Sequence, residues 1–167
     1  TTYKSDTPEG PWEIWYANNA QIKEQGFHQN GIKEGLTTYY YDDGKMQREG
    51  FFQNGLPDGI WTYWNKKGDK DFDFDFGSGL EHISLEDLVE RESTFFKLGE
   101  NNPFTGIITQ ENPETDYLFL GRTKNGKKDG QWVKWFPSGK DVPEVILVDV
   151  PTPEPDLPWS GGKQEQG

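Results

Sequence analysis

Cysteine is missing from this sequence, which excludes disulfides, thiolate catalysis and cysteine-ligated metal sites. No apolar run approaches the roughly 20 residues that a membrane-spanning helix needs. None of the HExxH, GxSxG, P-loop or GxGxxG patterns occurs. The only two histidines, His28 and His82, lie in unrelated contexts. We therefore expect a non-enzymatic protein with no cofactor, metal site or catalytic residue.

Positive charge is also scarce, with 17 Lys and Arg against 29 Asp and Glu and a net charge of −12. An acidic chain repels nucleic-acid phosphates and anionic lipid headgroups, so neither is an expected partner. Plain solubility explains the charge equally well. The chain begins at Thr1 rather than Met, which a removed signal peptide or trimming would explain. We favour a periplasmic or extracellular location over the cytoplasm.

Aliphatic residues are few, and the hydrophobic fraction is 31%, but aromatic residues make up 15% of the chain. Each aromatic side chain buries about 150–250 Å², so aromatic rings must supply most of any core. Glycine (20) and proline (11) are plentiful. This composition predicts many turns, few helices and a mainly β fold.

Internal repetition is the strongest signal in the sequence. The segment Gly26–Gly35 matches Gly50–Gly59 at an offset of 24 residues, and Thr123–Trp132 is a third copy. A half-copy opens the chain at Gly10–Tyr16. Repetition at this spacing predicts a chain of similar hairpins rather than a globule of mixed elements.

Asn-Gly pairs place the turns of these hairpins, at Asn30, Asn54 and Asn125. Each pair suits a two-residue type I′ turn, which requires positive φ at both positions. Further turns are expected at Asp43-Gly44, Lys67-Gly68 and Ser138-Gly139. The predicted strands follow: 12–17, 22–29, 36–41, 46–53, 59–65 and 70–76. Short connections make each strand pair with the one before it.

The repeat unit, Asn-Gly-x-x-x-Gly-x-Trp-x-x-(Trp/Tyr)-(Tyr/Phe)-x-x-Gly-Lys, resembles the MORN repeat variant of the bacterial YwqK-family antitoxin proteins. The resemblance covers residues 10–76 and 94–140, and Gly121–Trp132 matches best. Thr37 departs from it, standing where other units carry Trp, as does the acidic strand after Gly68. The resemblance implies a β-repeat fold and an interaction role.

Six of the seven tryptophans occupy two repeat positions, two and five residues after a glycine. Residues three apart on a strand face opposite sides, so both faces of the sheet should carry aromatic rings. One face is predicted to hold Trp12, Tyr39, Trp61, Tyr63, Trp132 and Phe136, and the other Trp15, Tyr40, Trp64 and Trp135. These rows either form the core or leave one row exposed to bind a protein or a carbohydrate, with Trp15, Trp64 and Trp135 as the candidate contacts.

Strict alternation marks one acidic strand, which runs from Asp71 to Phe76. The Phe rings are predicted to face one side and Asp71, Asp73 and Asp75 the other. The acidic side either protects a half-buried strand from aggregation, docks a basic partner or binds Ca²⁺. Carboxylates at i and i+2 lie about 6.5–7 Å apart, too far to share an ion without ligands from loops.

Residues 77–103 interrupt the repeats. Ser84 with an acid three residues later resembles a helix N-cap, and Leu85, Leu88 and Val89 fall on one helical face. We predict a short helix over residues 84–91. Strands should resume near Phe95 and Phe104, and the apolar runs 117–120 and 145–148 should anchor the C-terminal half.

The C-terminal segment alternates prolines from Pro151 to Pro158 and carries Trp159. Such spacing favours an extended polyproline II conformation that cannot join a ladder. The segment is either a linker or an arm that a neighbouring chain holds, with Pro153, Pro155 and Trp159 as contacts.

These observations predict an open, single-layer antiparallel β-meander with one short helix and an extended proline-rich tail. The expected divisions are 1–76 (N-terminal repeats), 77–103 (insertion), 104–150 (C-terminal repeat) and 151–167 (tail). We expect a scaffold subunit that binds partner proteins in a larger assembly, without spanning a membrane; attachment to a membrane complex stays open. The alternatives are an antitoxin or immunity-type inhibitor that uses its acidic face, and carbohydrate binding on the Trp row.

Overall fold

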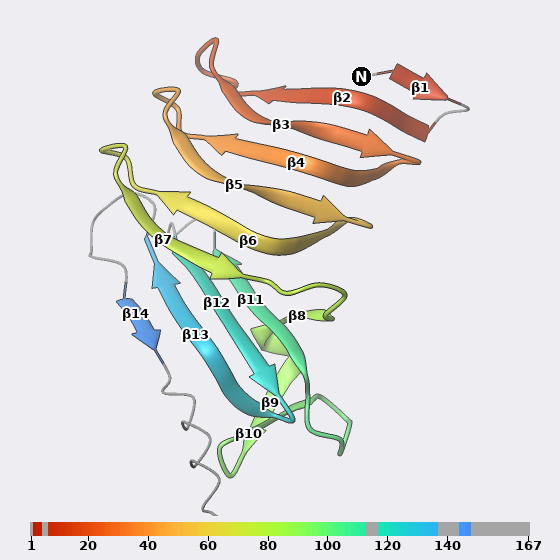
Figure 1. Ribbon diagram of the computed structural model, residues 1–167, viewed down its shortest axis with the longest axis vertical. Coiled ribbons are helices and arrows are strands. Elements are labelled where there is room, and N and C mark those ends of the chain that lie inside the picture. The colour runs from red at the N-terminus through yellow and green to blue at the C-terminus, as the bar shows by residue number, and fades with distance from the viewer. Residues whose placement is uncertain (1, 5–6, 113–116, 137–143, 148–167) are drawn as a thin grey trace, which may run out of the picture.

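The computed structural model describes residues 2–4, 7–112, 117–136 and 144–147, and all of the extended structure lies in two sheets and one hairpin. The first sheet is a meander whose seven strands lie side by side in chain order. They are β1 (Thr2–Lys4), β2 (Thr7–Trp15), β3 (Ile22–Gln29), β4 (Ile32–Tyr40), β5 (Met46–Gln53), β6 (Leu56–Trp64) and β7 (Lys70–Asp75). The mainly β, antiparallel and open fold predicted from the sequence is confirmed (Figure 1).

The second sheet follows the order β14-β13-β12-β11-β8. Its strands are β8 (His82–Ser84), β11 (Gly106–Asn112), β12 (Tyr117–Lys124), β13 (Lys127–Trp135) and β14 (Glu144–Leu147). β8 pairs with β11 in parallel, and the other pairs are antiparallel. Figure 1 shows this sheet extending from the β7 end of the meander, with its strands crossing β7 at an angle. The third repeat therefore builds its own sheet instead of continuing the first.

The three predicted Asn-Gly turns are confirmed. Asn30, Asn54 and Asn125 have φ values of 52°, 52° and 50°, and the following glycines have values of 82°, 82° and 72°. Positive φ at both positions is the geometry of a type I′ turn, whose twist matches that of the flanking strands. The turns fix the register of each hairpin and so decide which side chains share a face.

Two aromatic cores hold the second sheet in place. On one face, Leu118, Leu120, Val133 and Trp135 pack against Trp61, Tyr63 and Phe72 of the first sheet. The opposite face forms a second core. Trp132 packs there against Phe95 and Phe119, with ring centres 5.5 and 5.4 Å away. The second sheet thus adds a layer at β6 and β7, whereas the meander further from it is a single layer.

Tryptophans at one repeat position lie over glycines of the neighbouring strand. A Cβ atom built on Gly50 would lie 2.3 Å from the indole of Trp61, and one on Gly121 would lie 2.8 Å from that of Trp132. Both indoles donate a hydrogen bond to a carbonyl, Trp61 to Phe51 (3.1 Å) and Trp132 to Arg122 (3.0 Å). The glycine is required because no other residue leaves room for the ring.

The predicted helix over residues 84–91 is wrong in extent. Ser84 does cap a helical turn, accepting a hydrogen bond from the Glu86 amide at 3.4 Å, but the turn is a 3₁₀ helix (η1, Leu85–Asp87) of three residues. The chain then forms β9 (Leu88–Arg91), which pairs with β10 (Thr94–Lys97). The segment forms a hairpin instead of a helix because the hairpin lets Leu88 and Phe95 pack on the second core. The spacing of apolar residues in the sequence does not show this long-range packing.

Candidate functional site

A continuous ladder of polar side chains crosses six strands of the first sheet. Each member pairs directly with the next, so all of them point to the same face. The ladder runs Glu13, Gln25, Thr38, Glu49, Thr62, Asp73 from β2 to β7. Trp61, Tyr63 and Phe72 lie on the opposite side, in the first core. We call the ladder side the open face, because the described part of the chain leaves it uncovered.

Large apolar side chains occupy three matching positions of the first two repeats on the open face. They are Phe27, Ile32 and Leu36 in the first repeat and Phe51, Leu56 and Ile60 in the second, each pair 24 residues apart. We call these six residues the apolar strip. Register joins its two halves, since Leu36 pairs with Phe51. All six side chains are exposed, from 43% for Phe27 to 65% for Ile60. Folding alone does not explain six exposed apolar residues at equivalent positions.

The third repeat shows that the fold does not need apolar residues at these positions. Aligning Asn54 with Asn125 puts Arg122, Lys127 and Gln131 at the positions of Phe51, Leu56 and Ile60. The third repeat keeps its turn and its buried tryptophan despite these polar residues. The apolar strip is therefore a property of the first two repeats and not of the repeat fold.

Acidic side chains accompany the apolar strip. Glu34 pairs with Phe27 and Asp58 with Phe51 across the strands, which places both acids on the open face beside Glu49 of the ladder. Lys33 and Arg48 lie on the other face, where both contact the Tyr39 ring. Glu34, Glu49 and Asp58 thus make the open face acidic as well as apolar around the apolar strip.

Hydrogen bonds within the ladder hold its carboxylates in place. The Thr38 hydroxyl donates to Glu49 at 2.9 Å, and the Thr62 hydroxyl donates to Asp73 at 2.8 Å. Lys70 donates to the second oxygen of Asp73 at 2.5 Å. The Lys70 hydrogen bond, with that of Thr62, lowers the pKa of Asp73 below its usual value, so this carboxylate stays charged under mildly acidic conditions.

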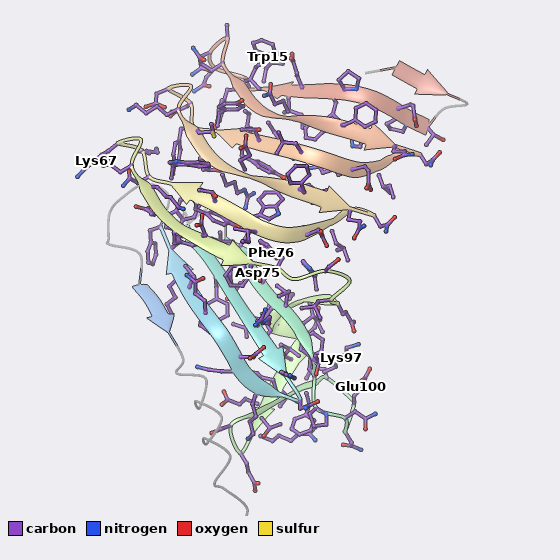
Figure 2. The ribbon with its side chains drawn as sticks, viewed as in Figure 1. Trp15, Lys67, Asp75, Phe76, Lys97 and Glu100 are labelled. Carbon is purple, nitrogen blue, oxygen red and sulfur yellow. The ribbon has the colours of Figure 1, made fainter. Side chains whose placement is uncertain are left out.

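The three tryptophans predicted to bind a partner have different surroundings. Trp15 is 51% exposed at the end of β2 (Figure 2), and Trp64 is half-buried. Trp135 is 1% exposed and packs edge-on against Tyr63 and Phe72, at centre distances of 5.3 and 5.8 Å. Trp135 belongs to the core and is removed from the candidate surface. Among the described tryptophans only Trp15 is exposed.

The acidic strand has the predicted alternation. Phe72, Phe74 and Phe76 are buried, and Asp73 and Asp75 are exposed. Its carboxylates serve the fold: Asp71 accepts from the Trp135 indole at 2.9 Å, and Asp75 accepts from the Gly77 amide at 2.8 Å. No group of three or more His, Cys, Asp or Glu residues within the described ranges is arranged to hold a metal ion.

Trp159, Pro153 and Pro155 were predicted as contacts of the tail, and all three lie outside the described residues. Across the part of the chain that the structure covers, no helix has the length and apolar character needed to cross a membrane.

Sequence reasoning missed the apolar strip. Its signal was present, because apolar residues recur at equivalent positions of the first two repeats and polar residues replace them in the third. The tryptophan pattern drew attention to positions that the structure mostly buries.

No protein-family model and no curated protein matches the chain. The resemblance to MORN repeats remains a prediction from the sequence.

Proposed function

We propose that this protein is a non-enzymatic interaction subunit whose open face binds a partner protein with a basic, partly apolar surface. The observation that carries the proposal is the apolar strip, six exposed residues at matching positions of two repeats that the third repeat replaces with polar ones. Burying exposed apolar area yields about 25 cal/mol per Å², so a partner gains most by covering these six side chains.

The size of the face suits a protein partner. Six strands about 4.8 Å apart and about 27 Å long present roughly 650 Å² before side-chain relief is counted. A standard interface buries about 800 Å² on each partner, so the face and its rim are large enough for one. The face is a broad sheet surface, which supports docking of a folded surface or an amphipathic segment.

The acids indicate the charge of the partner. Glu13, Glu34, Glu49, Asp58 and Asp73 surround or cross the apolar strip. Like charge on a partner would cost free energy, and opposite charge would accelerate association. The same acidity supports a second candidate, an antitoxin or immunity-type inhibitor that covers a basic toxin. Both candidates use the open face and differ only in whether the partner loses an activity.

Comparative recovery of partners tests the proposal. Immobilised wild-type protein is incubated with extract of the native source beside a Phe51→Asp/Ile60→Asp variant and a Leu98→Asp control. Leu98 is 59% exposed but follows β10, away from the open face. We expect wild type and control to retain the same basic protein and the double variant to lose it. Equal recovery by all three proteins would refute docking on this face.

Salt dependence separates the contribution of the acids to binding from that of the apolar strip. Replacing Glu49 and Asp58 by their amides should lower the association rate and flatten its dependence on ionic strength, because the acids steer a basic partner. Replacing apolar strip residues should instead raise the dissociation rate. An enzyme assay on the recovered partner then distinguishes a scaffold subunit from an inhibitor.

A further inference from the structure

A cleft of about 270 Å³ lies where the two sheets meet, on the side of the first sheet opposite the open face. Aromatic rings form much of its wall, among them Phe52, Trp61 and Phe76. Polar side chains line it as well: Arg48, Glu111, His82 and Thr109, with the hydroxyl-bearing Tyr39 and Tyr63. An apolar hollow with a few convergent polar groups is the common form of a small-ligand site.

Arg48 is fixed in this cleft by its neighbours. Its guanidinium carbon lies 4.2 Å from the centre of the Tyr39 ring, and its Nη1 donates to Glu111 Oε1 at 2.7 Å. Arg48 Nε is buried and has no hydrogen-bond partner among the described residues. Leaving a buried charged donor unpaired costs free energy.

Glu111 is a replaceable partner. Its side chain is 58% exposed, whereas that of Arg48 is 20% exposed, so Glu111 can turn to solvent while Arg48 stays in the wall. Burial lowers the pKa of His82 and so favours the neutral imidazole near pH 7. Arg48 then carries the positive charge of the cleft.

We propose that the cleft binds a small apolar carboxylate, whose oxygens accept from the Arg48 guanidinium at Nη1 in place of Glu111. A guanidinium is a planar, always charged donor that suits carboxylate geometry, so the ligand replaces one charged partner of Arg48 by another. The apolar body of the ligand packs on Trp61 and Phe76. The cavity is slightly smaller than those that hold drug-sized molecules, so it takes a group about the size of one aromatic ring. A free acid and the last residue of a peptide chain share this chemistry.

Calorimetric titration of the whole protein tests the proposal with N-acetyl-phenylalanine and its neutral amide, and with Gly-Gly-Phe and its C-terminal amide. We expect each carboxylate to bind about tenfold more tightly than its amide, because only the carboxylate pairs with the arginine. Tighter binding of the tripeptide would identify a chain end as the ligand, and tighter binding of the acetylated residue a free acid. Equal binding of acids and amides, or no binding at millimolar concentration, would overturn the proposal.

Two variants separate a binding role from a structural tie between the sheets. Glu111→Gln should tighten carboxylate binding severalfold, since it removes the internal competitor, and Arg48→Gln should abolish the preference for the acid. Arg122→Gln is the matched control, because Arg122 pairs with Asp129 and does not line the cleft. If Arg48→Gln does not fold, Glu111→Gln decides alone. Unchanged or weaker binding by Glu111→Gln would show that the ion pair only joins the sheets.

Discussion

Replacing Trp61 by alanine should be among the most damaging single changes in this protein. The indole is 2% exposed and lies between Phe52, Phe76 and Tyr39, with ring centres 5.2, 5.9 and 6.1 Å away. A tryptophan buries at most about 250 Å², which at 25 cal/mol per Å² gives an upper bound near 6 kcal/mol. Measured truncations of buried aromatic residues cost about 3–5 kcal/mol, and we expect a loss in this range.

The measurement is urea unfolding at 25 °C, followed by circular dichroism so that loss of the indole does not remove the signal. Trp15→Ala is the matched control, since Trp15 is 51% exposed and its removal should cost less than about 1 kcal/mol. Gly50→Ala gives a second approach to the same contact, because its methyl group would collide with the Trp61 ring at 2.3 Å. A loss below about 1 kcal/mol for Trp61→Ala, or equal losses at Trp15 and Trp61, would refute the assignment of Trp61 to the core.

Three further predictions concern the turns, the titration of histidine and the open face. Asn54→Ala should cost about 1–2 kcal/mol in the same urea assay, because alanine strains at a φ of 52°; an unchanged midpoint would contradict the turn geometry. Burial lowers the pKa of His82 below 6.5, so its contribution to the free energy of unfolding should be complete above pH 6.5 and should decline as the pH falls from 6.5 towards the lowered pKa. Thermal unfolding from pH 8 to 5 should therefore show a smaller decline for His82→Gln than for wild type. Identical pH profiles would show that His82 does not cause the decline. Leu36→Asp should change the free energy of unfolding by less than about 0.5 kcal/mol, because its side chain is 47% exposed; a large loss would show that Leu36 supports the fold.

The features that the sequence predicts well are local ones. Each Asn-Gly pair sets its own φ values, so the hairpins at Asn30, Asn54 and Asn125 follow from two residues each. Alternation from Asp71 to Phe76 likewise assigns side chains to faces without knowledge of what covers them.

Contacts between distant segments could not be predicted in this way. Periodicity shows that Trp132 and Trp135 face opposite sides, but not that the first sheet covers Trp135. The apolar pattern around Leu88 is compatible with a helix and with a strand. Packing on the second core determines that the segment forms a strand. The open face is recognised only after the structure shows which side of the first sheet the second sheet leaves uncovered.

Site-specific photo-cross-linking tests docking on the open face most directly. A benzophenone amino acid is placed at Leu36, in the apolar strip, and in a separate protein at Leu98, which is similarly exposed but distant from it. After irradiation in extract of the native source, we expect one basic protein to be joined to position 36 and none to position 98. Adducts at position 98 alone, or the same adducts at both positions, would contradict the proposal that the open face is the binding surface.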